Sequence, residues 1–364
     1  MRKLYLDNIR WITVVLVVIY HVIFMYNHVE KSLVIGPFQE VQYQDAFLYL
    51  VYPWFMLLLF VVSGMSARFY LEKHSNKEFI KSRTVKLLVP STIGLLVFQW
   101  IQGYFSMAIN GAFESMAMAP APVKWLIMVL SGQGVLWFAQ LLWFFSLILA
   151  WIRVIEKDLL YKKCAKTNVV VLLLLTVAIW GSSLILNTPL ITVYRFGIYG
   201  LGFLIGYFIL SHDEVMERLV KWWAPLSVAA VLLAVIFTVV YWGDNYATDS
   251  VLQTPLCNVY AWIAILAILS FMKKWGDREN GFSKWMNQRS WGLYVFHYLV
   301  ISACAYGLKV YVTDMPVILY YVINLVAAFI GSYVLYAVIS RIPVIRWCVL
   351  GLSKKKKVKI EEKA

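Results

Sequence analysis

The chain has 364 residues, of which 62% are hydrophobic and only 14% are charged, and its formal net charge is +14. A mean hydropathy of +0.73 over this length indicates a polytopic membrane protein and leaves little room for a separate soluble domain. Lys and Arg collect on the cytoplasmic side of membrane spans, so the positive balance requires no nucleic-acid partner.

The first apolar segment contains an arginine and a histidine, which membrane helices rarely hold. Arg10 and His21 are eleven residues apart; on an α-helix they lie within about 20° of each other and about 16 Å apart. Because a charge at the bilayer centre costs about 3 kcal/mol, such residues usually face a protein interior or a water-filled path. Asp7 can pair with Arg10 on the same helix face. The alternative interpretation is a snorkelling Arg10 and a hydrogen-bonded packing histidine.

Further along the chain, ten segments in all are long and apolar enough to cross a bilayer. They lie near residues 9–28, 47–68, 87–109, 134–152, 168–186, 190–210, 222–242, 253–272, 290–310 and 316–340. The apolar run 123–131 is too short to cross, and we expect a re-entrant or interfacial piece there. We interpret Gly200, Gly202 and Gly206 as helix-packing residues, because small residues let membrane helices approach closely.

The distribution of Lys and Arg gives an orientation to these segments. A cytoplasmic N-terminus puts 29 of the 33 Lys and Arg on inside segments, leaving Lys31, Lys124, Arg195 and Lys309 outside. The sequence therefore predicts an all-α, multi-pass protein of about ten transmembrane helices with both termini cytoplasmic. We divide it into an integral-membrane domain, 1–345, and a basic cytoplasmic tail, 346–364. The four cysteines are scattered, which indicates neither a disulfide framework nor a metal site.

In this topology Arg10 lies at the inner membrane surface and His21 lies slightly past the midplane. A guanidinium presents a planar fork that suits phosphate, and a neutral imidazole can act as the general base for an alcohol. The two side chains could therefore hold the ends of a long, thin molecule that enters from the cytosol.

These residues resemble a known family. Asp7-x-x-Arg10 with His21 is similar to the Arg-x10-His signature of the membrane-bound acyltransferase-3 family. Later segments agree in order: Phe60-Val-Val-Ser63-Gly64, Phe79-x-x-x-Arg83-x-x-Lys86-Leu87-x-x-Pro90, Leu136-Trp137-Phe138, Arg195-Phe-x-x-Tyr199-x-x-Gly202 and Ser290-x-x-x-Tyr294-x-x-His297. Lys86 stands where Arg is commoner, which keeps the charge but loses the fork. The resemblance covers nearly the whole chain and is closest to the glucan-biosynthesis-protein-C branch.

The resemblance implies an enzyme of the cell membrane that moves an acyl group, commonly acetyl or succinyl, from cytosolic acyl-CoA to a hydroxyl. The acceptor would be an extracytoplasmic carbohydrate or glycolipid, and acyl-CoA would be a donor substrate rather than a bound cofactor. His21 would be the general base, and Arg10, positioned by Asp7, would clamp a phosphate or the pantetheine arm. Two further groups of residues follow from the same resemblance. They are Arg68, Arg83 and Lys86 for donor phosphates, and Arg195, Tyr294 and His297 for substrate.

Each of these residues has a simpler alternative. Arg68, Arg83 and Lys86 also satisfy the rule that positive charges stay inside. Arg195 could snorkel to the interface, and His297 could be a hydrogen-bonded core histidine. The rival function is a transporter or flippase for a glycan or a lipid-linked substrate, whose signs would be inverted repeats and broken helices. A scaffold without chemistry would leave the Arg10 and His21 alignment unused. A homo-oligomer is possible, and the sequence does not decide this.

Overall fold

A computed structural model describes residues 3–29, 41–188, 193–312 and 315–352, and within these ranges the chain forms helices and no strands. The all-α prediction is confirmed. The Lys-rich run 354–359 lies outside the described residues.

Seven helices are long and apolar enough to cross a membrane, and they match seven of the ten predicted segments. They are α1 (Leu4–Phe24), α2 (Ala46–Leu71), α7 (Trp137–Glu156), α12 (Trp223–Val240), α14 (Pro255–Trp275), α15 (Gly281–Tyr311) and α16 (Val317–Ile339). The predicted segment 190–210 contains α10 (Phe196–Ile205) and a π-helical turn, η6 (Gly206–Leu210). A bend of 96° separates it from α11 (Asp213–Val220), and this pair would make an eighth span. The protein is a multi-pass membrane protein.

The remaining two predicted segments form shorter apolar helices. Segment 168–186 contains α9 (Val169–Ser183). Segment 87–109 is broken into π-helical turns, η3 (Thr84–Leu88) and η4 (Leu95–Gln99), followed by α4 (Trp100–Ile109). Pro90 explains the break, since it lacks an N–H and clashes with the preceding turn. The hydroxyls of Ser91 and Thr92 donate to the carbonyls of Leu87 and Leu88 at 2.7 and 2.6 Å, which satisfies backbone groups beside the break.

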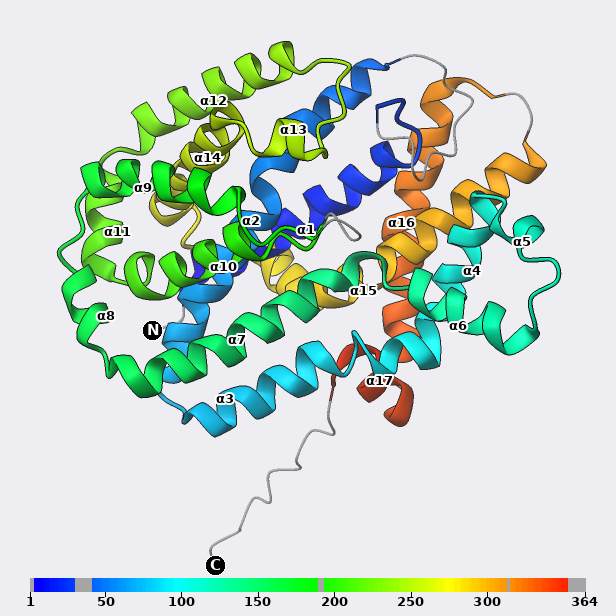
Figure 1. The fold of residues 1–364 in the computed structure, drawn as a ribbon, viewed down its shortest axis with the longest axis horizontal. Helices are drawn as coiled ribbons and strands as arrows, with labels where there is room; N and C mark the ends of the chain where they lie inside the picture. The colour runs from blue at the N-terminus through cyan, green and yellow to red at the C-terminus, as the bar shows by residue number, and fades with distance from the viewer. Residues whose placement is uncertain (1–2, 30–40, 189–192, 313–314, 353–364) are drawn as a thin grey trace, which may run out of the picture.

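Helices α1, α2, α14 and α15 run through the bundle, and α12 lies at its edge (Figure 1). In α2, 72% of the most apolar window is buried, compared with 11% in α12 and 22% in α16. Apolar side chains left exposed on α12 and α16 are typical of lipid-facing helices. A Cβ added at Gly206 would lie 2.1 Å from the carbonyl oxygen of Val61 on α2, so this glycine permits close helix packing, as predicted.

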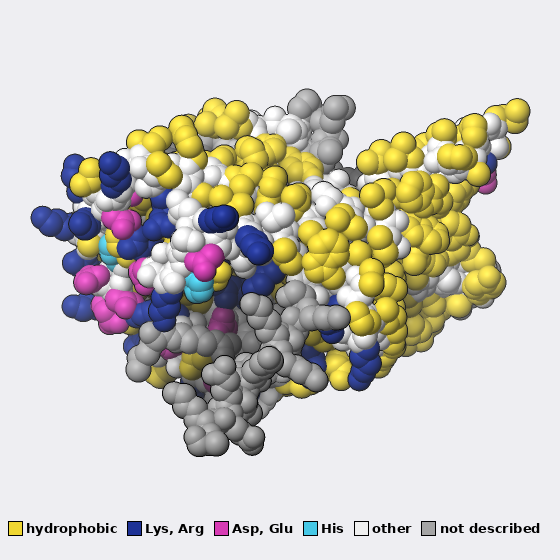
Figure 2. Space-filling model, turned by 90° about the horizontal axis from the view of Figure 1, so that it is seen from below, with side chains coloured by type: hydrophobic (Ala, Val, Ile, Leu, Met, Phe, Trp, Pro, Cys, Tyr) yellow, Lys and Arg dark blue, Asp and Glu magenta, His cyan; other side chains and the backbone are white. Residues whose placement is uncertain are grey.

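Basic side chains gather over one end of the molecule, and hydrophobic side chains cover most of the remaining surface in the same view (Figure 2). Around this end lie the start of α1, α3 (Asn76–Arg83), α8 (Leu159–Cys164) and α11 (Figure 1). We call it the inner end, because Lys and Arg favour the cytoplasmic side. The opposite end is the outer end.

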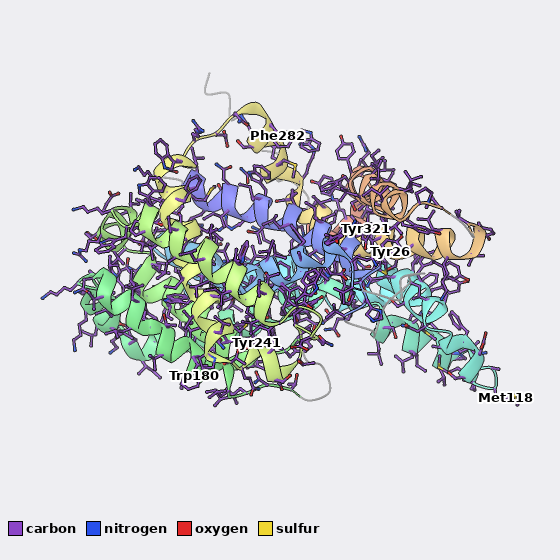
Figure 3. The ribbon with its side chains drawn as sticks, turned by 90° about the horizontal axis from the view of Figure 1, so that it is seen from above. Tyr26, Met118, Trp180, Tyr241, Phe282 and Tyr321 are labelled. Carbon is purple, nitrogen blue, oxygen red and sulfur yellow. The ribbon has the colours of Figure 1, made fainter. Side chains whose placement is uncertain are left out.

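At the outer end, α4, α5 (Ala112–Ser115) and α6 (Ala121–Ser131) project from the bundle as a hairpin, with Met118 at its tip (Figure 3). Helix α6 contains the run 123–131 that we predicted to be too short to cross. A Cβ at Gly103 would lie 1.7 Å from the carbonyl oxygen of Met128, so α4 and α6 are in backbone contact there. We call residues 100–131 the outer hairpin.

Helix α17 (Pro343–Leu350) follows the last long helix and packs against the bundle through Cys348, Val349 and Leu350, which are buried. The indole N–H of Trp291 on α15 donates to the carbonyl of Leu350 at 3.1 Å. The first part of the predicted tail, 346–352, is thus a packed segment.

Candidate active site

His21 lies in the last turn of α1, and its ring packs against side chains of α1 and α15. Its Nδ1 lies 2.8 Å from the carbonyl oxygen of Val17 and 3.2 Å from Nε2 of His297 on α15. The ring of Tyr298 packs edge-on against it, with centroids 5.0 Å apart, as does the ring of Tyr20. The imidazole is therefore fixed in orientation by two helices.

His297 is fully buried behind His21, and it is separated from it by 276 positions in sequence. Its Nδ1 lies 2.8 Å from the carbonyl oxygen of Tyr294 and 3.1 Å from that of Leu293, both on its own helix. The two predicted substrate residues on α15 therefore have different positions. Tyr294 lines the cavity described next, and His297 does not.

A cavity of about 760 Å³ opens in front of His21. Its inner part is lined by side chains of α1, α2, α7, α10 and α15. Its outer part is lined by the outer hairpin and the turn that follows it, which contribute polar groups at Ser106, Asn110, Ser115, Ser131 and Gln133. Aromatic rings from Tyr20, Tyr52, Trp137, Tyr199, Tyr294 and Tyr298 also face the cavity. The histidine therefore meets a mixed polar and aromatic chamber on the outer side of the molecule.

Arg10 lies at the opposite end of α1, three turns toward the inner end. Its Nη1 donates to Oδ1 of Asp7 at 2.6 Å, as predicted from their spacing, and its Nη2 donates to the hydroxyl of Ser66 on α2. The Arg10 side chain remains 37% exposed. A guanidinium held in this way is anchored and still accessible from the inner end.

The comparisons with known proteins agree with this geometry. A family model described as an acyltransferase domain matches residues 3–337, nearly the whole chain. The chain belongs to the acyltransferase-3 family. It is an acyltransferase, and the predicted resemblance is confirmed at the level of the family. No curated protein and no solved structure shows significant similarity to it.

Two further basic residues of the acyltransferase lie at the inner end, Arg83 near Arg10 and Lys86 near Arg83. Arg83 ends α3 and Lys86 follows in η3, and neither makes an ion pair with a carboxylate of the described residues. Burial lowers the pKa of Arg83, and the charge of Arg10 lowers it further. Partial desolvation lowers the pKa of Lys86 although the residue is exposed, and the charge of Arg83 is the second cause. We call Arg10, Arg83 and Lys86 the basic cluster. Arg83 is repelled by Arg10 and repels Lys86, and a bound anion would relieve that repulsion.

Arg68 differs from the basic cluster because it already has partners. Its guanidinium pairs with Asp158 at 2.6 Å and with Glu72 at 3.3 Å, and it stacks on the ring of Tyr161 at 3.5 Å. Only 12% of the side chain is exposed. This predicted phosphate contact therefore ties α2 to the segment between α7 and α8.

Arg195, the predicted outer-side substrate contact, is 6% exposed and immediately precedes α10. Its Nη2 donates to the carbonyl of Leu252 at 3.4 Å, and its Nε has no hydrogen-bond partner in the described part of the chain. Burial argues against interfacial snorkelling. Arg195 does not line the cavity, although its neighbours Val193 and Tyr199 do.

Several residues of this site were missed by the sequence patterns. Ser66 and Tyr298 contact Arg10 and His21 from other helices. Gln133 at the cavity wall donates to Oε1 of Gln140 at 3.1 Å, and Gln140 donates to the carbonyl of Ser91 at 2.8 Å, beside the Pro90 break. The available signal was the pair of half-buried glutamines, one on α7 and one in the turn before it, because polar side chains are rare within apolar membrane segments. No group of three or more His, Cys, Asp or Glu side chains suited to a metal occurs among the described residues.

Proposed function

We propose that this acyltransferase moves an acyl group, acetyl or succinyl, from cytosolic acyl-CoA to a hydroxyl of an extracytoplasmic carbohydrate or glycolipid. The observation that supports the proposal best is the placement of His21 at the wall of an outer cavity, on the same helix as the inner basic cluster's Arg10. We place the enzyme in the cell membrane, with the bilayer as its surroundings.

The basic cluster suits the donor. The head group of acyl-CoA carries several phosphates, and Arg10, Arg83 and Lys86 can give charge-assisted hydrogen bonds to them. Arg10 and His21 lie about 16 Å apart along α1, a separation that an extended pantetheine arm can cover. In this arrangement the thioester reaches His21 while the phosphates stay at the inner end.

The cavity suits the acceptor. Carbohydrates present hydroxyls to polar side chains and apolar faces to aromatic rings, and the cavity supplies both kinds of contact. Its volume of about 760 Å³ is within the range of small-molecule sites. The hydroxyl of Tyr294 donates to the carbonyl of Val135, so Tyr294 shapes the wall between α15 and the turn that precedes α7.

The transfer step needs one base and no covalent acyl-enzyme. His21 takes the proton from the acceptor hydroxyl as the oxygen attacks the thioester carbonyl. The tetrahedral intermediate then collapses, the C–S bond breaks, and the protonated His21 returns its proton to the departing thiolate of CoA. The products are an ester and CoA–SH, and the enzyme regains its starting state.

Purified protein in proteoliposomes, with labelled acetyl-CoA or succinyl-CoA on one side and acceptor extract on the other, tests the proposal. We expect His21→Ala to lower the transfer rate at least 100-fold and His74→Ala, whose exposed side chain lies far from the cavity, to leave it unchanged. Thermal stability must match that of the wild type. If His21→Ala transfers as fast as the wild type, catalysis by this residue is excluded and another group must be the base. If the wild type itself transfers neither acyl group to the acceptor extract, the proposed donor and acceptor classes fail.

A further inference from the structure

The hydrogen bonds of His297 determine which of its ring nitrogens holds the proton. Its Nδ1 faces two carbonyl oxygens, at 2.8 and 3.1 Å, and carbonyl oxygens can only accept hydrogen bonds. A bare Nδ1 would place a lone pair against two acceptors inside a fully buried environment, which is costly. The neutral ring therefore carries its proton on Nδ1, and its Nε2 presents a lone pair.

The same reasoning then applies to His21. Its Nδ1 faces the carbonyl oxygen of Val17 at 2.8 Å and Nε2 of His297 at 3.2 Å, and both of these are acceptors. The proton of the neutral His21 ring therefore resides on Nδ1. The lone pair of His21 is on Nε2, the nitrogen that these contacts leave unused, and His21 lines the cavity.

We propose that His297 is a positioning residue. Together with the carbonyl of Val17, its Nε2 accepts the hydrogen bond from Nδ1–H of His21, which leaves Nε2 of His21 to the acceptor hydroxyl. The inference rests on the proposed function and adds to it, because it states which nitrogen is the base and what orients it. His297 does not line the cavity.

The arrangement differs from a histidine oriented by a carboxylate. No Asp or Glu of the described residues contacts either ring, and the titratable groups that face the pair are Tyr20, Tyr294 and Tyr298. When Nε2 of His21 takes the hydroxyl proton, the ring becomes a cation and its Nδ1–H bond to His297 becomes charge-assisted. The proton leaves Nε2 again for the thiolate of CoA, so His297 keeps its own proton throughout.

Two substitutions separate this role from simple packing. In His297→Gln the Oε1 atom can reach the place of Nε2 and accept the same hydrogen bond, whereas His297→Phe fills the space and accepts none. We expect kcat to fall about 10- to 100-fold in His297→Phe with little change in KM, and less than 10-fold in His297→Gln. Equal kcat in His297→Phe and the wild type, at matched thermal stability, would overturn the proposal. So would an equal loss in both variants, because the accepted hydrogen bond would then not be the cause.

A spectroscopic measurement tests the assignment without any activity. The chain has five histidines, so ¹⁵N-histidine labelling gives a spectrum that single substitutions can assign, with His74→Gln as the control. We expect both His21 and His297 to be protonated on Nδ1 and bare on Nε2 in the resting enzyme. A His21 protonated on Nε2 would refute the inference even if His21 proved essential for transfer. Conversely, if the proposed function is wrong, the transfer assay will show no acyl transfer by the wild type, and the spectrum can still be as expected.

Discussion

Two arginines at the inner end of the molecule have different surroundings, and their substitutions should affect different quantities. We expect the loss of Arg83 to weaken acyl-CoA binding and the loss of Arg68 to lower stability. Arg83 makes no ion pair with a carboxylate of the described residues, whereas Arg68 pairs with Asp158 and Glu72. We expect Arg83→Ala to raise KM for acyl-CoA about 10- to 100-fold, the effect of one charge-assisted contact, with little change in stability. Initial rates across acyl-CoA concentrations measure this.

Arg68→Ala is the matched control for that experiment. Its removal leaves Asp158 without its guanidinium partner, so we expect the free energy of unfolding to fall by about 1–3 kcal/mol while KM for acyl-CoA stays near the wild-type value. A larger rise in KM for Arg68→Ala than for Arg83→Ala would move the donor site from the basic cluster to the α7–α8 connection.

If Lys86 belongs to the proposed donor site, acyl-CoA binding should depend on pH. A lysine is positive below its pKa. Partial desolvation and the charge of Arg83 lower the pKa of Lys86, so Lys86 loses its charge at a lower pH than a free lysine does. We expect KM for acyl-CoA to rise as the pH increases through this lowered pKa. In Lys86→Arg the cation persists and the rise should disappear. An unchanged pH profile in Lys86→Arg would remove Lys86 from the donor site.

At the scale of helices, the outer hairpin depends on close backbone contact between α4 and α6. A Cβ at Gly103 would lie 1.7 Å from the carbonyl oxygen of Met128, whereas one at Gly181, in α9, would meet nothing within 4 Å. We expect Gly103→Ala to lower the free energy of unfolding by about 1–3 kcal/mol, and Gly181→Ala to raise it by up to about 1 kcal/mol. Because the hairpin lines the cavity, Gly103→Ala should also raise KM for the acceptor and not for acyl-CoA. Equal thermal stability of the two variants would contradict the packing.

The sequence predicted the membrane helices better than the side-chain contacts between them, because a helix depends on local composition and a contact between helices does not. An apolar segment of about 20 residues predicts a membrane span wherever it occurs, so α1, α2 and α14–α16 were all predicted from local composition. Arg10 and Asp7 are three residues apart, and helix geometry alone brings them together. The contact between His21 and His297 joins residues 276 positions apart, and no local pattern encodes it. The break after Pro90 shortened a predicted span, because neighbouring helices and hydroxyls can satisfy a broken backbone.

Across the whole molecule, the proposed chemistry requires one orientation, since acyl-CoA is cytosolic and the basic cluster must face it. The charge count that gives this orientation, 29 of 33 Lys and Arg on one side, can be tested directly. In a variant with all four cysteines replaced by alanine, a single cysteine is introduced at Met118 or at Lys77. Met118 lies at the tip of the outer hairpin and is 96% exposed, and Lys77 is exposed on α3 at the inner end.

A membrane-impermeant maleimide added to intact spheroplasts should label Met118→Cys, and it should label Lys77→Cys only after the membrane is permeabilised. The reverse pattern would place Arg10, Arg83 and Lys86 outside, away from the cytosolic acyl-CoA pool, and the donor assignment would fail even if His21 remained essential. Labelling of both positions in intact cells would instead mean that the hairpin and α3 lie on the same side. The number of membrane crossings between residues 77 and 118 would then be even rather than odd, and the broken segment around Pro90 would be re-entrant. The experiment thus decides the orientation of the donor site and whether the shortened segment 87–109 crosses the bilayer.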